Sequence, residues 1–151
     1  SSLDHLVYQS FAFQPFWFLR KMHLEDLPTV IEKLLHLLSA QQVQYTININ
    51  GSNTCISLLD ILYFESDGHY IIAYTRTKPI RFKARMSDLE SELNKYSFIR
   101  CHIGFLVNCR FIKICNRTSI TLITDQTIPV SRAKADEVQN IFMTYMRSLR
   151  P

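Results

Sequence analysis

The sequence predicts a mainly β domain that is preceded and followed by helices. Residues 43–131 read as many short strands separated by turn residues. This stretch lacks the regular strand–helix alternation of a doubly wound fold. Residues 24–40 and 133–149 instead repeat apolar residues at helical spacing. We therefore expect a β sandwich or meander with a helical N-terminal segment, one internal helix and a C-terminal helix.

The N-terminal block, residues 1–42, is predicted to contain a helix, a strand and a second helix. Residues 3–13 are compatible with a short helix, and residues 16–19 form a compact apolar run typical of a buried strand. Apolar residues recur at helical spacing over residues 24–40. Pro28 fits only the first turn of that second helix, because proline lacks the N–H that later turns need.

The middle block is predicted to be strands with a single helix among them. Residues 43–48 alternate between apolar and polar side chains, as a half-buried strand does. Asn50-Gly51 is a strong signal for a two-residue hairpin turn, and the return strand is expected at residues 52–58. The same patterns predict further strands at residues 61–65, 70–75, 80–83, 105–107, 111–115, 119–124 and 127–130.

Two helices are predicted beyond the N-terminal block. Ser87 and Glu90, three residues apart, have the form of a capping box with Ser87 as the N-cap. The helix that they start should end near Asn94. A terminal helix over residues 133–149 is expected to bury one apolar face. That face consists of Val138, Ile141, Phe142, Tyr145, Met146 and Leu149.

Composition and charge restrict the class of protein. The 47% of hydrophobic residues are enough for a packed core, and no apolar run reaches the ~18–20 residues of a membrane span. Residues 1–42 hold three Lys/Arg and four Asp/Glu (−1), residues 43–132 hold eleven and seven (+4), and residues 133–151 hold three and two (+1). A positive surplus in the middle block is what a segment that meets a polyanion would carry.

The cysteines suggest an intracellular chain without a metal site. Cys55, Cys101, Cys109 and Cys115 form no CxxC pair, which favours free buried thiols in a reducing cytosol. A zinc site built from Cys101, His102 and Cys109 stays open as an alternative, although its spacing matches no familiar ligand pattern.

No motif for catalysis is present. The sequence holds no Gly-rich phosphate loop, no HExxH and no GxSxG. Ser66, Asp67 and His69 lie close together, but neighbouring turn residues rarely form a catalytic triad. We therefore expect neither enzymatic activity nor a cofactor.

Basic and polar residues on predicted loops remain as candidates for binding. They are His69 in a turn, Arg100 and His102 before an apolar strand, and Ser131-Arg132 before the terminal helix. Guanidinium and imidazole groups reach the acceptors of guanine in the major groove. Each position also has an ordinary structural interpretation, as a solvated turn, a packing or capping group, or a helix start.

The middle block resembles a known family in a series of ordered motifs. The motifs are Ile61-Leu62-Tyr63-Phe64-Glu65-Ser66, Gly68-His69-Tyr70, Met86-Ser87-Asp88-Leu89-Glu90, Phe98-Ile99-Arg100-Cys101-His102, Gly104-Phe105-Leu106-Val107-Asn108 and Ile128-Pro129-Val130-Ser131-Arg132. Over about residues 43–145 their order and spacing are similar to those of the LytTR DNA-binding domain. The resemblance implies an elongated β-β-β sandwich of about ten short antiparallel strands, whose loops enter successive major grooves of promoter DNA.

The resemblance also implies which residues meet DNA. They are His69, Arg100, His102, Ile103, Gly104, Ser131, Arg132 and Lys134, with base reading at His69, at Ile103-Gly104 and at Arg132. Two positions depart from the family. Ile103 stands where relatives carry a polar or basic residue, and it can make only apolar contact, for example with a thymine methyl group. Gly104 stands where serine is usual, which removes a possible phosphate contact.

The N-terminal block resembles the end of a receiver domain. Residues 16–21 are similar to its final strand, with Lys21 at the phosphate-contacting lysine, and residues 24–40 are similar to its last helix. This implies a receiver remnant and linker over residues 1–42 and a DNA-binding domain over residues 43–151, as in response regulators of the AgrA/LytR/ComE type. The phosphate-accepting aspartate lies earlier in receivers and is not in this chain.

The expected partner is double-stranded promoter DNA with repeated half-sites, bound by a homodimer. A histidine kinase would act only through the missing receiver domain, and no membrane partner is expected. Two other functions stay open: a β module whose basic loops bind an acidic protein, and a single-stranded nucleic-acid binder, which would need exposed aromatic residues.

Overall fold

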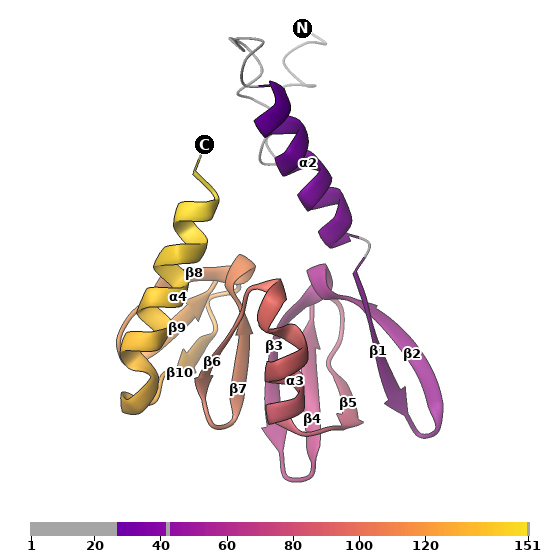
Figure 1. Ribbon diagram of the computed structural model, residues 1–151. Coiled ribbons are helices and arrows are strands. Elements are labelled where there is room, and N and C mark those ends of the chain that lie inside the picture. The colour runs from indigo at the N-terminus through magenta and orange to yellow at the C-terminus, as the bar shows by residue number, and fades with distance from the viewer. Residues whose placement is uncertain (1–26, 42, 151) are drawn as a thin grey trace, which may run out of the picture. The chain divides into compact units, whose positions relative to one another are not determined.

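A computed structural model describes residues 27–41 and 43–150 (Figure 1). The chain divides into two compact units after residue 39, and each is described by itself. Helix α2, Leu27–Gln41, belongs to the first unit up to residue 39; it confirms the predicted helix and places Pro28 in its first turn. The helix and strand predicted for residues 3–13 and 16–19, and Lys21 with them, lie outside the described residues.

The second unit is mainly β, as expected, and its described residues form ten antiparallel strands in three sheets. The five-stranded sheet has the order β5-β4-β3-β7-β6, the three-stranded sheet β10-β9-β8, and β1 pairs only with β2. The strands are β1 Gln44–Ile49, β2 Ser52–Ser57, β3 Ile61–Asp67, β4 Tyr70–Thr75, β5 Ile80–Lys83, β6 Phe98–His102, β7 Phe105–Asn108, β8 Ile112–Cys115, β9 Ser119–Leu122 and β10 Thr127–Pro129.

Helices connect and cover these sheets. Two are α-helices, α3 Met86–Leu93 and α4 Ala135–Ser148, and four are short 3₁₀ turns. The 3₁₀ turns are η3 Leu58–Asp60, η4 Asn94–Tyr96, η5 Cys109–Phe111 and η6 Arg132–Lys134. Within residues 27–41 and 43–150, no helix has the length and apolar character needed to cross a membrane.

Helix α3 packs on one face of the five-stranded sheet. Phe64 lies opposite Ala73 on β4 and Leu106 on β7, so these three side chains share that face. Met86, Leu89 and Leu93 lie three and four residues apart on α3 and are buried against them. The hairpin β1-β2 adds Ile47 and Ile56 to the same core, which confirms the predicted alternation of its first strand.

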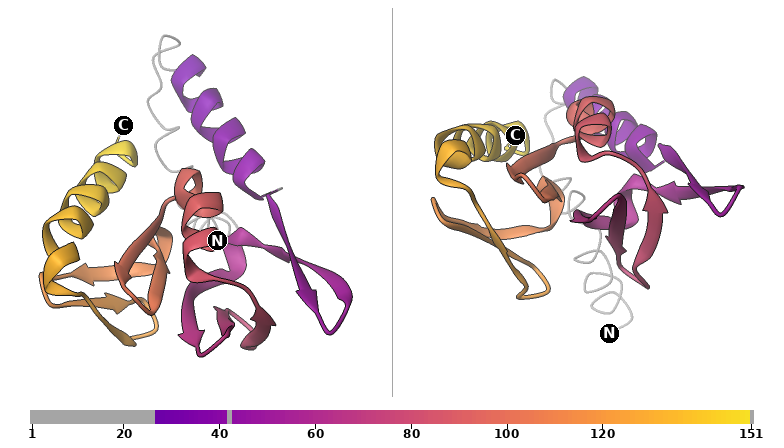
Figure 2. Two further views of the ribbon diagram at one scale, coloured as in Figure 1. Left: turned by 60° about the horizontal axis from the view of Figure 1, so that its bottom comes forward. Right: turned by 90° about the horizontal axis from the view of Figure 1, so that it is seen from below.

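A second core fills the space between the other sheet face, the three-stranded sheet and α4 (Figure 2). Tyr63 and Val107, opposite each other on β3 and β7, contribute to it from the larger sheet. The smaller sheet and α4 supply Ile120, Leu122, Ile128, Ala135 and Val138. The two cores pack on opposite faces of the five-stranded sheet. Because close-packed cores are rigid, the turns at the ends of its strands are held in fixed positions.

Helix α3 begins differently from the prediction. Arg85, not Ser87, is its N-cap, and no side chain caps it. The amides of Asp88 and Leu89 donate to the Arg85 carbonyl at 3.1 and 3.2 Å. Burying Met86 in the first core draws Ser87 into the first turn, so the predicted capping box does not form.

The apolar face of the terminal helix is only partly covered. Val138 is fully buried, and Phe142 and Tyr145 are half-buried against the second core. Ile141, Met146 and Leu149 are exposed in this unit, contrary to the prediction of one buried face. The covered stripe of the helix is therefore narrower than the predicted face, and it runs through Val138, Phe142 and Tyr145, which lie four and three residues apart.

The cysteines follow the expectation in part. All four are free; Cys101 and Cys109 are buried, Cys115 is half-buried, and Cys55 is exposed, against the prediction. Cys55 faces outward because its neighbour Ile56 turns into the first core. Among the described residues no three His, Cys, Asp or Glu side chains converge to hold a metal ion, so the zinc alternative finds no support.

Burial should make two of these thiols inert. It raises the pKa of both Cys101 and Cys109 to about 12, so each stays a neutral thiol well above pH 8. Since the thiolate is the nucleophile, iodoacetamide at pH 8 should modify Cys55 in the folded protein and leave these two intact. Mass spectrometry of peptides from native and denatured samples measures this. Rapid native modification of Cys101 or Cys109 would contradict the packing of the second core.

Candidate nucleic-acid interface

His69 lies in the two-residue turn between β3 and β4. Gly68 has a φ of +61°, the left-handed conformation that glycine adopts at the first central position of a type II′ turn. Beside the turn, at the ends of the two strands, the Arg81 guanidinium pairs with Asp67 at 2.8 Å and stacks on the Tyr70 ring at 3.8 Å. These contacts hold the base of the hairpin, whereas the His69 side chain is exposed.

Ile103 and Gly104 form the turn between β6 and β7. Ile103 is 79% exposed, and the backbone around it is tightly bonded. Arg100 donates from Nε to the His102 carbonyl at 2.8 Å, from Nη2 to the Ile103 carbonyl, and from Nη1 to Glu90 Oε2 at 3.1 Å. The Gly104 amide donates to His102 Nδ1 at 3.1 Å. The guanidinium of Arg100 is therefore turned toward its own loop.

Ser131 and Arg132 lie where the smaller sheet meets α4. The Ser131 amide donates to the Cys101 carbonyl of β6 at 2.9 Å, and Arg132 begins η6 with an exposed side chain. Lys134 is half-buried and pairs with Glu137 at 2.7 Å. Of the basic residues in this segment, Arg132 is thus the better placed to contact a ligand.

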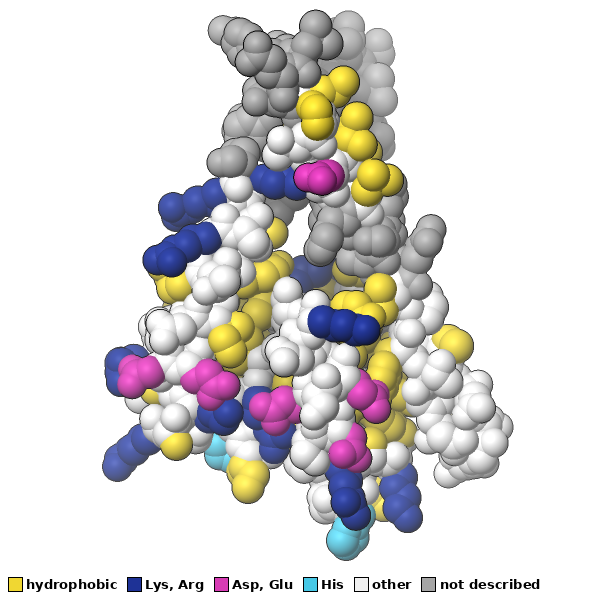
Figure 3. Space-filling view, in the orientation of Figure 1, with side chains coloured by type: hydrophobic (Ala, Val, Ile, Leu, Met, Phe, Trp, Pro, Cys, Tyr) yellow, Lys and Arg dark blue, Asp and Glu magenta, His cyan; other side chains and the backbone are white. Residues whose placement is uncertain are grey.

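Backbone hydrogen bonds bring these three segments to one edge of the unit. The Ser66 amide, three residues before His69, donates to the Gly104 carbonyl at 2.9 Å, and Ser131 bonds to Cys101 on the other side of the same turn. The β6-β7 turn therefore lies between the other two, and all three are at the lower edge in Figure 1. Histidine side chains and several Lys and Arg side chains lie along that edge in Figure 3.

Two basic residues beside His69 were not predicted from the sequence. Lys83 lies opposite Tyr70 in the β4-β5 pair, and Arg85 follows it before α3. Both line an open groove of about 810 Å³ together with His69, and the acidic residue Asp88 also borders it. Within the described part of the chain neither forms an ion pair. The alternating spacing of basic residues along β5 was the signal that could have identified them.

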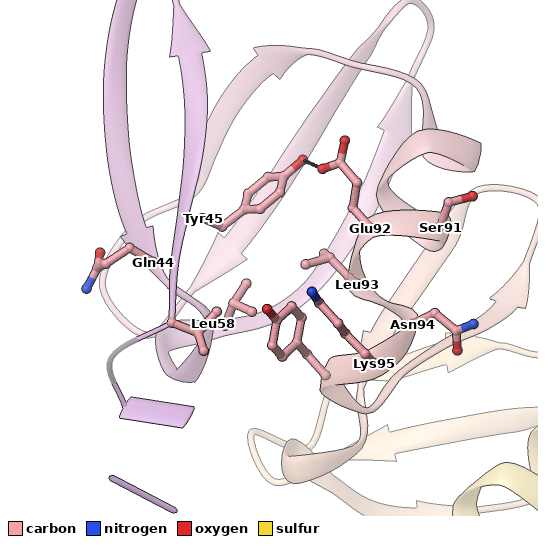
Figure 4. A pocket seen from close by; sticks show the side chains of 10 residues that line it. Gln44, Tyr45, Leu58, Ser91, Glu92, Leu93, Asn94 and Lys95 are labelled. Atoms are coloured by element: carbon pink, nitrogen blue, oxygen red, sulfur yellow. Dashed lines mark hydrogen bonds between the residues drawn. The ribbon is translucent and has the colours of Figure 1, made fainter. Parts of the chain in front are cut away.

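A second hollow, of about 600 Å³, lies elsewhere (Figure 4). It is bordered by the start of β1 and the end of α3, and none of the predicted binding residues lines it. Tyr45 Oη donates to Glu92 Oε2 at 2.7 Å across it. Burial and this hydrogen bond raise the pKa of Tyr45, which keeps its phenol neutral. This hollow takes no part in the edge formed by the three turns.

Comparisons with known proteins agree with this architecture. A family model described as the LytTr DNA-binding domain matches residues 51–143, more than half of the chain. The heme-containing CO-sensing transcriptional regulator RcoM 1 of Paraburkholderia xenovorans (strain LB400) is 27% identical over 94 residues, which cover 57% of this chain and 34% of that protein. The chain thus spans about a third of the length of this curated relative.

A solved structure has the same fold. It is the LytTr DNA-binding domain of a methyl-accepting/DNA response regulator from Bacillus cereus. The two structures align with a TM-score of 0.58 and 21% sequence identity, over 66% of this chain and 96% of that one. The three-sheet arrangement of the second unit is therefore that of a solved domain.

Proposed function

This chain belongs to the LytTR family of DNA-binding domains, and from that membership we propose that it binds double-stranded promoter DNA in a sequence-specific manner as the output domain of a bacterial two-component response regulator. The matching family model is described as a DNA-binding domain, which supports a role in transcription regulation rather than enzymatic activity. The DNA-binding domain corresponds to residues 43–151 in this proposal. The observation that carries it is the pair of backbone hydrogen bonds that hold three turns at one edge.

The edge is suited to both parts of DNA recognition. Lys83 and Arg85 bind phosphates, which supplies affinity without regard to sequence. His69 and Arg132, both exposed, donate hydrogen bonds to base edges in the major groove. The other predicted contacts, at His102, Gly104, Ser131 and Lys134, are largely held by bonds within the protein and contribute by placing the turns.

The input side of the proposal rests on residues 1–42. Their resemblance to the last strand and helix of a receiver supports a two-component regulator of the AgrA/LytR/ComE type, controlled by a histidine kinase through a complete receiver. The relative in Paraburkholderia is named as a heme-containing CO sensor. The gene sequence upstream of residue 1 distinguishes these cases, because a complete receiver there would carry the phosphate-accepting aspartate.

We infer that two copies bind repeated half-sites. Linking two modest interfaces through one duplex raises avidity by effective concentration, without new contacts to DNA. Sedimentation of the protein on duplexes with one or two half-sites measures the stoichiometry. Two copies on the longer duplex are expected, and one copy on both would contradict the dimer.

A shift assay tests the proposed function. Duplexes are first selected from a randomised library, and the enriched duplex is then compared with a scrambled one and with its separate strands. Preferential retention of the enriched duplex is expected. Failure to retain any duplex at low salt would refute the proposal, and binding to an acidic polypeptide instead would favour the protein-interaction alternative. Equal binding of the separate strands would favour a single-strand binder.

Replacing Lys83 and Arg85 together by alanine should weaken binding to all duplexes alike. The slope of log K against the logarithm of the salt concentration should become shallower by about 1 for each phosphate contact that is lost. The slope of the double variant should therefore be shallower by about 2. Fluorescence anisotropy between 50 and 200 mM salt is a suitable measurement. A double variant of the exposed residues Lys95 and Arg147, which removes the same charge elsewhere, is the matched control. If the two double variants had the same slope of log K against log salt, the assignment of phosphate contacts to Lys83 and Arg85 would be wrong.

A further inference from the structure

The turn between β6 and β7 carries an exposed apolar residue. Ile103 is 79% exposed, although single exposed apolar residues are common and alone indicate nothing. Its position is distinctive, because the turn lies between the His69 turn and the Arg132 segment, to which Ser66 and Ser131 bond it. The exposed side chain of Ile103 therefore lies between the two segments to which base reading is assigned.

The turn is held more firmly than a simple surface loop requires. Each of the three guanidinium nitrogens of Arg100 donates one hydrogen bond. The acceptors are the carbonyls of His102 and Ile103 and the carboxylate of Glu90 on α3. The side chain of Arg100 is only 14% exposed. The amide and carbonyl of Gly104 are bonded as well, to His102 and to Ser66. The backbone is thus fixed on both sides of Ile103.

We propose that Ile103 reads the methyl group of a thymine, and that Arg100 is the positioning residue that holds it there. This inference rests on the proposed function and adds a specificity-determining contact to it. The side chain of isoleucine has no hydrogen-bonding atom, and the C5-methyl group of thymine is the apolar feature of the major groove. A β-branched side chain on a fixed turn loses little freedom on contact. The middle turn therefore discriminates by apolar contact, and its neighbours by hydrogen bonds.

Replacement of thymine by deoxyuridine tests the contact, since it removes only that methyl group. The intact chain first selects a duplex from a randomised library, and each thymine is then replaced in turn. At one or two positions the affinity should fall about fourfold, the factor that corresponds to one buried methylene-sized group. Ile103→Ala should bind the thymine duplex more weakly and lose the sensitivity to deoxyuridine at that position.

The outcomes separate this inference from the proposed function. If an enriched duplex is bound but no thymine is sensitive, or if Ile103→Ala keeps the sensitivity, the methyl contact is wrong while DNA binding stands. If no duplex is enriched, the proposed function itself fails, and the inference with it.

Arg100→Met tests the positioning role. It should bring the thymine-to-deoxyuridine affinity ratio close to one and leave the salt slope unchanged. Partial unfolding of the variant would reduce the active protein equally for both duplexes and would leave the thymine-to-deoxyuridine affinity ratio unchanged. This ratio therefore distinguishes a loss of positioning from a loss of folding. Glu90→Gln keeps an acceptor for Arg100 Nη1 and should keep the ratio. An unchanged ratio in Arg100→Met, or a salt slope reduced by about 1, would overturn the assignment and indicate a direct DNA contact.

Discussion

Replacing Arg132 by alanine is expected to weaken binding to the preferred duplex by about 5- to 150-fold, the equivalent of ~1–3 kcal/mol for one base-reading side chain. Binding to a scrambled duplex should change much less. The reason is that Arg132 is exposed at the start of η6, while the preceding Ser131 amide is bonded to β6. Competition between the two duplexes in an anisotropy titration measures the discrimination.

Arg147→Ala is the matched control for this variant. Arg147 is an exposed arginine in the last turn of α4, roughly 20 Å from Arg132 along the helix axis. Its removal changes the net charge by the same amount and should leave discrimination as it is in the parent. If Arg132→Ala discriminated like the parent while remaining folded, the assignment of base reading to this segment would be wrong.

The largest expected effect on stability is at Asn108. It is the one buried polar side chain among the described residues, at 5% exposure. Its Nδ2 donates to the carbonyls of Leu58 and Ile61 at 3.2 and 2.9 Å, and its Oδ1 accepts from the Arg110 amide at 3.1 Å. These bonds join η3 and β3 of the first core to η5, which enters the second.

Asn108→Leu keeps the branching of the side chain at Cγ but leaves two carbonyls and one amide without this partner. A loss of about 3–5 kcal/mol in the free energy of unfolding is expected, since each buried unsatisfied group costs roughly 1–3 kcal/mol. Urea unfolding followed by circular dichroism measures it. Asn116→Leu, at an exposed position, should change stability by under about 0.5 kcal/mol. A change of similar size in the two variants would show that the three bonds contribute nothing net.

Local sequence patterns predicted most of the elements. Strands β4 and β5 begin and end where the alternation placed them. Asn50 and Gly51 both have positive φ, at 50° and 84°, as the predicted hairpin turn requires. These features depend on residues that are neighbours in the chain, so the sequence alone is enough to identify them.

Strand β6 was missed for a physical reason. Phe98 packs into the first core, whereas Ile99 and Cys101 pack into the second. A strand that is buried on both faces shows no alternation, and its central Arg100 made it look like a loop. Only its pairing with β7, and the cover that α3 and α4 give to it, make it a strand.

The positions of residues along the candidate edge were predicted in part. His69 and Arg132 were placed on exposed turns, and they are found there. Lys83 was assigned only to a strand, because its approach to the His69 turn depends on the β4-β5 register. Arg100 was expected to face DNA, and its contacts within the loop instead suggest the positioning role proposed above.

By itself the sequence determined a mainly β domain, its hairpin turns and its family, because periodicity and turn residues act over a few positions. The tertiary structure alone decided that three segments far apart in the chain, at His69, at Ile103-Gly104 and at Ser131-Arg132, lie at one edge. That arrangement depends on two backbone hydrogen bonds, from Ser66 to Gly104 and from Ser131 to Cys101. Backbone groups are the same in every residue, so no residue type in the sequence marks which of them will meet.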